Sequence, residues 1–220
     1  MVPYAAWLGN TFALVILTTS GTVISAALVG YGFARFQFRG RDILFLMTLG
    51  TMMLPSQVTL IPRYILFHKM GWLNSIKPLW IPPWFGGGAF AIFLVRQFVS
   101  TLPTELDEAA VIDGAGYFRI WWQIIVPLCR PALATIGVIS FIGVWNDFMG
   151  PLIYLNSPDK FTIALGLQFF KQGGGLGAEG EPLQHILMAA TVVTVMPCLV
   201  LFFSVQRFFV RGIVLSGIKG

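Results

Sequence analysis

The sequence predicts an all-α integral membrane protein that crosses the bilayer about five times. Its 220 residues are 56% hydrophobic and only 10% charged, and their mean hydropathy is +0.80. An ordinary soluble domain has about 25% charged residues, whereas a transmembrane helix needs about 20 consecutive, mostly apolar ones. Five stretches of suitable length carry at most one charged side chain each. Composition and patterning therefore indicate a bundle of membrane-spanning helices.

The first three expected spans cover residues 11–34, 43–62 and 78–96. The first contains no charged side chain and is followed by a segment rich in arginine. The second contains Pro55, and the third contains Pro82 and Pro83 ahead of the glycines of residues 86–88. Because proline removes a helix hydrogen bond, we expect kinks or unwound ends in both of these spans.

The last two expected spans cover residues 131–155 and 186–206. Asp147 is the one ionisable residue of the fourth span, and the fifth has none. Together the five spans define a transmembrane domain of residues 10–210, followed by a short tail of residues 211–220.

The distribution of basic residues predicts how the chain is oriented. With the N-terminus outside the cell, nine of the 14 lysines and arginines lie inside and five lie outside. The positive-inside rule favours this topology. It places both the segment between the third and fourth spans and the C-terminal tail in the cytoplasm.

That cytoplasmic segment is unusually acidic. It holds four of the nine carboxylates within nine residues: Glu105, Asp107, Glu108 and Asp113. Thr104 and Asp107 have the spacing of a capping box, so we expect a helix to begin at Glu105 and to stop at Gly114.

Two interpretations of this helix are open from its residues alone. Leu106, Ala109 and Ala110 would give it one small, flat side, which permits close approach of another backbone. One interpretation is a loop that rests on the lipid surface, where aromatic residues such as Trp121 and Trp122 are enriched. The other is a helix that docks in a groove of a partner protein, with the alanines as the close contact and the carboxylates at its edge.

A spaced motif favours the second interpretation. The pattern is EAA, three residues, glycine, nine residues and IxLP, and six of its fixed positions are matched by Glu108, Ala109, Ala110, Gly114, Ile124 and Pro127. This pattern resembles the EAA loop of ABC importer permeases, with Val126 in place of leucine. SFIGVWNDFMGPLIYL and the C-terminal FVRGIVLSGIKG resemble the maltose-type, carbohydrate-uptake branch of these permeases, in particular its second, shorter membrane subunit. The resemblance covers residues 10–220.

The resemblance implies a type I ABC importer in the bacterial or archaeal inner membrane. Residues 104–127, named the EAA loop below, would carry the coupling helix that a cytoplasmic ATPase holds. The implied partners are a second permease subunit, two ATP-binding cassette subunits and an external sugar-binding protein. ATP and Mg would be bound by those partners, because the chain has no GxxxxGK[ST] loop and is not expected to be an enzyme. The family has a sixth helix ahead of the first span seen here, so we expect the start of this chain to be truncated or misassigned.

Polar residues inside the spans are the candidates for the solute pathway. Asn146 and Asp147 follow Trp145 in the fourth span, where a charge is costly and usually faces the bundle interior or water. Hydroxyl groups of a sugar pair well with such side chains, and Trp145 offers a ring face. Gln57, just after Pro55, is a further candidate. Structural contacts between helices are the alternative role for all four residues.

Four other functional classes are less consistent with the sequence. A permease of the same architecture for a solute other than sugar is the nearest alternative. A secondary carrier usually needs several titratable groups within the membrane, and Asp147 is the only acid in a span. An enzyme or a metal centre is disfavoured because Cys129, Cys198 and the two histidines are scattered along the chain. The basic residues form no stripe that would indicate nucleic-acid binding.

Overall fold

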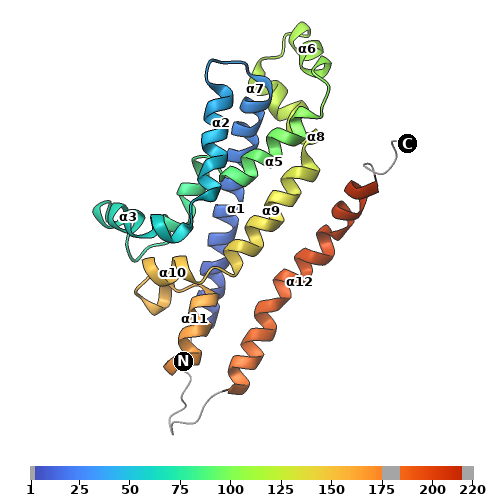
Figure 1. The fold of residues 1–220 in the computed structure, drawn as a ribbon. Coiled ribbons are helices and arrows are strands. Elements are labelled where there is room, and N and C mark those ends of the chain that lie inside the picture. The colour runs from blue at the N-terminus through green and yellow to red at the C-terminus, as the bar shows by residue number, and fades with distance from the viewer. Residues whose placement is uncertain (1–2, 175–183, 215–220) are drawn as a thin grey trace. The chain divides into compact units, whose positions relative to one another are not determined.

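The computed structural model describes residues 3–174 and 184–214, and within these ranges it contains helices and loops but no strand (Figure 1). Short 3-10 or π-helical turns lie at residues 51–53, 82–84, 121–125, 158–160 and 170–174. The α-helices are α1 (Tyr4–Arg35), α2 (Arg41–Gly50), α3 (Ser56–Lys69), α4 (Lys77–Trp80), α5 (Ala89–Ser100), α6 (Glu105–Ile112), α7 (Tyr117–Ile120), α8 (Val126–Leu128), α9 (Arg130–Trp145), α10 (Met149–Tyr154), α11 (Ile163–Phe169) and α12 (Gln184–Val214).

Three helical segments in the described ranges are long and apolar enough to cross a membrane: Tyr4–Arg35, Lys77–Ser100 and Gln184–Ser204. Two bent pairs raise the number to five if each pair is one span. One pair joins Arg41–Met53 to Ser56–Lys69 at 99°, and the other joins Tyr117–Leu128 to Arg130–Trp145 at 77°. The positions of the membrane boundaries remain predictions.

The expected irregularities at the prolines are confirmed. Leu54, directly before Pro55, is extended (φ −79°, ψ 120°), as the proline ring requires of the residue that precedes it. The first bend of 99° lies at this point. Between α4 and α5 regular helix gives way to a 3-10 turn at Pro82–Trp84 and to three glycines with positive φ.

The interval 131–155, expected as one helix, contains two. α9 ends at Trp145, and α10 begins at Met149. The break has a local cause, because Asp147 Oδ1 accepts a hydrogen bond from the backbone N–H of Gly150 (3.1 Å) and thereby satisfies a free donor at the start of α10. Pro151 has no backbone N–H, so it cannot donate the helix hydrogen bond that would continue α9 past Asp147.

Residues 19–61 and 81–137 form one compact unit. Its core is built from the later part of α1, from α5 and from the chain between α6 and α9, and includes Val95, Val99, Ile120 and Ile125. Small residues let the backbones approach closely. At Gly30 an added Cβ would lie 2.7 Å from Val95 Cβ. At Gly87, where φ is 65°, it would lie 2.6 Å from the carbonyl oxygen of Thr22.

The other unit comprises the described residues of 1–18, 62–80 and 138–220. Its core surrounds Trp7, whose indole N–H donates to the carbonyl of Pro158 (2.7 Å). The fully buried Thr11 hydroxyl accepts from the backbone N–H of Ile163 (2.8 Å). These bonds hold the loop before α11 against the first turns of α1.

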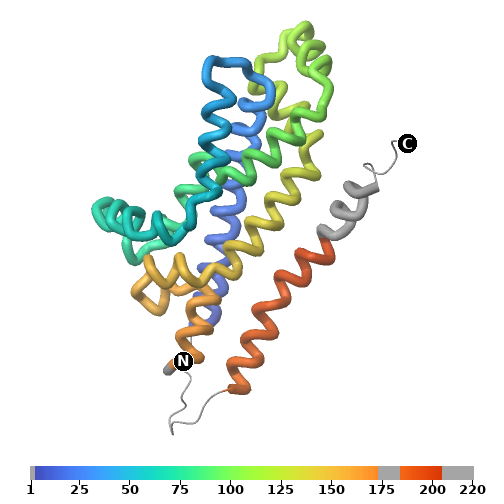
Figure 2. Tube along the Cα trace, viewed as in Figure 1, coloured from blue at the N-terminus to red at the C-terminus, as the bar shows by residue number. Residues whose placement is uncertain are grey.

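α12, red in Figure 2, is attached within this unit by hydrogen bonds to its main chain. The Tyr4 hydroxyl donates to the carbonyl of Ala190 (3.2 Å), and the Trp145 indole donates to that of Thr194 (3.2 Å). In the most apolar 18-residue stretch of the described part of α12, 0% of the residues are buried. This stretch of α12 therefore presents its side chains to the surroundings of the chain.

Candidate functional site

α6 is the acidic helix of the EAA loop, and it begins at Glu105 as the sequence predicts. It stops where Gly114 adopts a left-handed conformation (φ 79°) and donates its N–H to the carbonyl of Val111 (2.9 Å). The predicted capping box is wrong. Thr104 has a helical conformation and makes no side-chain cap bond. Its expected partner Asp107 instead pairs with an arginine.

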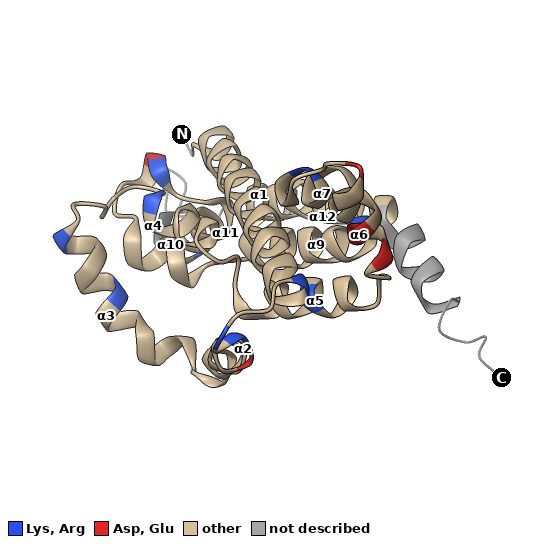
Figure 3. Cartoon of the chain, turned by 90° about the horizontal axis from the view of Figure 1, so that it is seen from above, with Lys and Arg blue, Asp and Glu red and all other residues tan. Residues whose placement is uncertain are grey.

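The side chains of α6 divide between two faces. Glu105, Glu108, Ala109 and Ile112 are exposed, and their spacing of three, four and seven residues places them on one side of a helix. Ile112 is 86% exposed. The acidic residues of this helix are marked red on the cartoon in Figure 3. The outward face thus combines carboxylates with uncovered apolar groups.

The expectation that Ala109 and Ala110 share one docking side is wrong. Ala110 is 8% exposed and belongs to the core of its own unit, together with Tyr31 and Trp121, whereas Ala109 is exposed. Successive residues of an α-helix point about 100° apart, so neighbouring alanines need not face the same partner. Ala110 serves the internal packing, and Ala109 is the alanine left free.

Arg35, the last residue of α1, holds the inward face of α6. Its Nε lies 2.6 Å from Asp107 Oδ2, and the two side chains are 9% and 17% exposed. Burial raises the pKa of the Asp107 carboxyl, while the Arg35 charge opposes that rise. The same guanidinium donates through Nη2 to the carbonyls of Leu102 (3.0 Å) and Pro103 (3.2 Å). The sequence did not single out Arg35, which lies in the arginine-rich segment after the first span and contributes there only to the predicted orientation in the membrane.

The second half of the EAA loop also packs against α1. Trp121 is 4% exposed, and its indole N–H donates to the carbonyl of Ala27 (3.2 Å). Tyr117 meets Phe36, the residue directly after α1, edge to face, with ring centroids 5.2 Å apart. The motif residues Ile124 and Pro127 are half-buried, and Ile124 packs against the core. These two residues shape the loop and are not on the exposed face of α6.

Gly114 offers a test of why the motif needs glycine. A Cβ at this position would meet nothing within 4 Å, so only the positive φ opposes substitution. We expect Gly114→Asn to preserve the thermal stability of the purified chain in detergent, because asparagine tolerates this conformation. Gly114→Val should lower its stability by about 1–2 kcal/mol. Equal melting temperatures for the two variants would contradict a conformational role.

The four residues expected along the solute pathway have different environments. Trp145 is 2% exposed and packs between Phe12 and Phe141, with centroid distances of 5.1 and 5.5 Å. Asn146 is exposed, and its amide donates to the carbonyl of Ile142 (2.8 Å).

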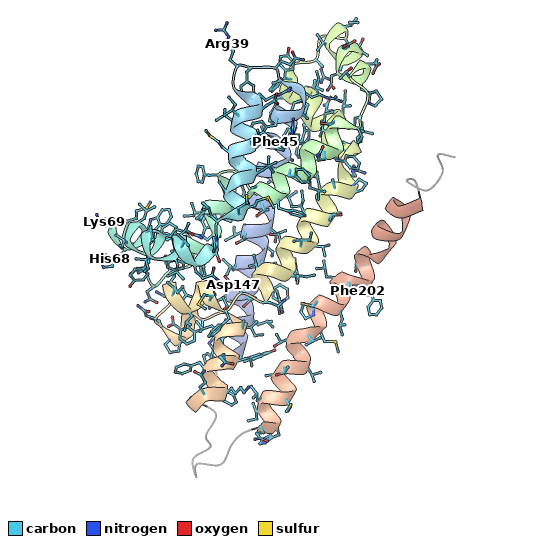
Figure 4. The ribbon with its side chains drawn as sticks, in the orientation of Figure 1. Arg39, Phe45, His68, Lys69, Asp147 and Phe202 are labelled. Carbon is cyan, nitrogen blue, oxygen red and sulfur yellow. The ribbon has the colours of Figure 1, made fainter. Side chains whose placement is uncertain are left out.

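Asp147 is half-buried at the break after α9 and is labelled in Figure 4. Gln57 is exposed in the first turn of α3. Among the residues that the structure describes, no three histidines, cysteines or carboxylates are placed to hold a metal ion.

Comparison with known proteins identifies the family. The family model described as "Binding-protein-dependent transport system inner membrane component" matches residues 24–215. The arabinooligosaccharides transport system permease protein AraQ of Halalkalibacterium halodurans is 32% identical over 217 residues, which are 99% of this chain and 75% of that protein. The sn-glycerol-3-phosphate transport system permease protein UgpE of Yersinia pestis is 35% identical over 213 residues, 96% of this chain and 73% of its own.

A solved structure has the same fold. A bacterial ABC transporter involved in the import of the acidic polysaccharide alginate superposes with a TM-score of 0.85 at 22% identity, over 95% of this chain and 76% of that chain. The predicted fold class, an all-α transmembrane subunit of the type I ABC importer kind, is confirmed, and so is the predicted family. This chain belongs to the inner membrane components of binding-protein-dependent transport systems and is an ABC importer permease, a multi-pass membrane subunit rather than an enzyme.

Proposed function

We propose that this permease forms part of the pathway of a sugar importer and that α6 is the helix through which a cytoplasmic ATPase drives it. The observation that carries the coupling role is the outward face of α6, where Glu105, Glu108, Ala109 and Ile112 are exposed outside every candidate span. An exposed apolar side chain flanked by carboxylates is typical of a surface that another protein covers. The names of the relatives support a polyhydroxylated solute.

The complete importer in this proposal contains four kinds of chain. A second, different permease completes the pathway, two ATP-binding cassette subunits bind ATP and Mg, and an external binding protein delivers the sugar. The family description supports the binding protein and the membrane location. This chain itself requires no cofactor in the proposal.

The coupling step is mechanical. When the ATPase pair closes on ATP, a groove that holds α6 moves, and α6 moves with it as a rigid body. The pathway then changes between inward and outward openings, because ATP binding favours one of the two states. Glu105 and Glu108 fix the register of the helix in the groove and transfer no proton.

Along the pathway, Asn146, Asp147 and Gln57 are proposed to meet the solute hydroxyls in the assembled importer. Asn146 and Gln57 are exposed, which supports access to them. Trp145, which the sequence suggested as a sugar platform, is packed between two phenylalanines, so its proposed part is to hold the end of α9, directly before Asn146 and Asp147.

Cysteine cross-linking tests the coupling role, and the two alanines provide a matched pair. In a background without Cys129 and Cys198, Ala109→Cys should capture a P-loop ATPase in native membranes, and ATP should change the yield. Ala110→Cys, one residue away but 8% exposed, should capture little. Capture of lipid alone at position 109 would contradict the coupling role and would support the other interpretation, in which the EAA loop rests on the lipid surface.

A further inference from the structure

We propose that Arg35 is a positioning residue that ties the coupling helix to the end of α1, so that a displacement of α6 is passed on to α1. This inference rests on the proposed function of α6. The sequence motif contains neither Arg35 nor Asp107, and both emerge from the contacts of the folded chain.

The Arg35 guanidinium contacts three groups, which are one carboxylate and two main-chain carbonyls. Its Nε contacts the Asp107 carboxylate on the first turn of α6 at 2.6 Å. Nη2 donates to the carbonyls of Leu102 and Pro103, in the turn that leads into α6. A guanidinium is planar and presents its donors in a fixed fork, so it can hold these points in one arrangement. A lysine has a single ammonium group and cannot reproduce it.

The carboxylates of α6 have separate tasks in this arrangement. Glu105 and Glu108 are exposed on the outward face, which is the face available to an ATPase. Asp107 faces inward, and its side chain is 17% exposed. α6 thus lies between a surface for a partner protein and a fixed connection to α1 in the same chain.

The connection by Arg35 is distinct from the packing of the rest of the EAA loop. After Gly114 and Gly116, the loop is held to α1 by the Trp121 bond to Ala27, and to the residue directly after α1 by the contact of Tyr117 with Phe36. Removing the Arg35 ion pair leaves these contacts in place. Such a change should therefore loosen α6 relative to α1 while the loop remains folded. A mostly buried ion pair of this kind suits a role in fixing geometry, because its desolvation offsets much of its attraction.

The test follows the response of α1 to ATP in the importer copurified with its ATPase and placed in lipid nanodiscs. A nitroxide on Leu28→Cys, an exposed position of α1 two turns before Arg35, reports movement through its spin-resonance spectrum. Cross-linking from Ala109→Cys, in a separate sample, reports whether α6 still contacts the ATPase. Neither measurement requires the solute to be known. Arg35→Gln and Asp107→Asn are compared with Arg39→Gln, which changes the same charge at an exposed position of the α1–α2 loop (Figure 4).

We expect Arg35→Gln and Asp107→Asn to reduce the ATP-induced spectral change at position 28 by about fivefold or more, within the usual range of coupling between sites. ATP-dependent cross-linking from position 109 should persist, and Arg39→Gln should match the unchanged chain. The double variant should be no worse than Arg35→Gln alone, because Arg35→Gln already removes the contact with Asp107 together with the bonds to Leu102 and Pro103. If Arg35→Gln fails to reach the membrane, Arg35→Lys, which retains the charge, takes its place with the same expected loss.

A full spectral response in Arg35→Gln with cross-linking intact would overturn the inference alone. So would the absence of any ATP response at position 28 in the unchanged chain when cross-linking is normal. Failure of position 109 to capture an ATPase in the unchanged chain would instead overturn the proposed function, and the inference with it.

Discussion

Replacing Gly87 by alanine is expected to prevent the chain from accumulating in folded form. The new Cβ would lie 2.6 Å from the carbonyl oxygen of Thr22 and 2.9 Å from the backbone nitrogen of Ala26. Both atoms belong to the main chain of α1, which cannot turn aside as a side chain can. The left-handed conformation alone costs about 1–2 kcal/mol, and overpacking adds about 1–3 kcal/mol. The sum is a large part of the roughly 5–15 kcal/mol that stabilises a typical domain.

Gly88 is the matched control for this prediction. Its φ of 89° is also positive and, with ψ 144°, belongs to a region that glycine alone adopts readily, but a Cβ there would meet nothing within 4 Å. Gly88→Ala should therefore suffer only the conformational cost and still be recovered as a single species after solubilisation in detergent. The comparison requires the amount of chain in the membrane fraction and its profile in size-exclusion chromatography. Equal recovery of both variants would show that the contact between residue 87 and α1 does not limit folding.

Ala109→Trp is expected to abolish assembly with the ATPase while leaving the permease itself intact. Ala109 is exposed, so the chain has room for an indole, but a helix seated in a partner's groove has none. Copurification of the ATPase should be lost, and the thermal unfolding of the isolated permease should be unchanged.

The neighbouring Ala110→Trp should fail for the opposite reason. Ala110 is packed in the core with Tyr31 and Trp121, so a larger side chain there displaces the chain's own residues. We expect reduced recovery and a lower unfolding temperature. Retention of the ATPase by Ala109→Trp at the level of the unchanged chain would exclude position 109 from the docking face.

The parts of this structure that depend on local chemistry could be predicted from the sequence. The bend at Pro55 follows from the geometry of a residue before proline, and the start of α6 at Glu105 was also placed correctly. The motif spacing led to the right family because it spans both halves of one loop.

What could not be predicted depends on contacts between distant residues. Asp107 was expected to cap its own helix, but its carboxylate is engaged by Arg35 from α1. That pairing exists only once α1 and α6 have packed, and no local pattern reports it. Conversely, the break at Asp147 is a local capping event that the sequence could have revealed. It was interpreted as a continuous span because the long apolar stretch outweighed the Asp147, Gly150 and Pro151 signals.

The hydrogen bonds that attach α12 depend on the residue type of the donor but not on that of the acceptor. Tyr4 and Trp145 each donate to a main-chain carbonyl of α12, at Ala190 and Thr194. Every residue type supplies a carbonyl with a second lone pair, so only the donor's identity has to be encoded. Mutations at positions 190 and 194 can change the acceptor's side chain without deleting the acceptor. The exposed surface of α12 is thus able to diverge between related permeases, adapting to new neighbours in the membrane, while the helix keeps its place in the chain.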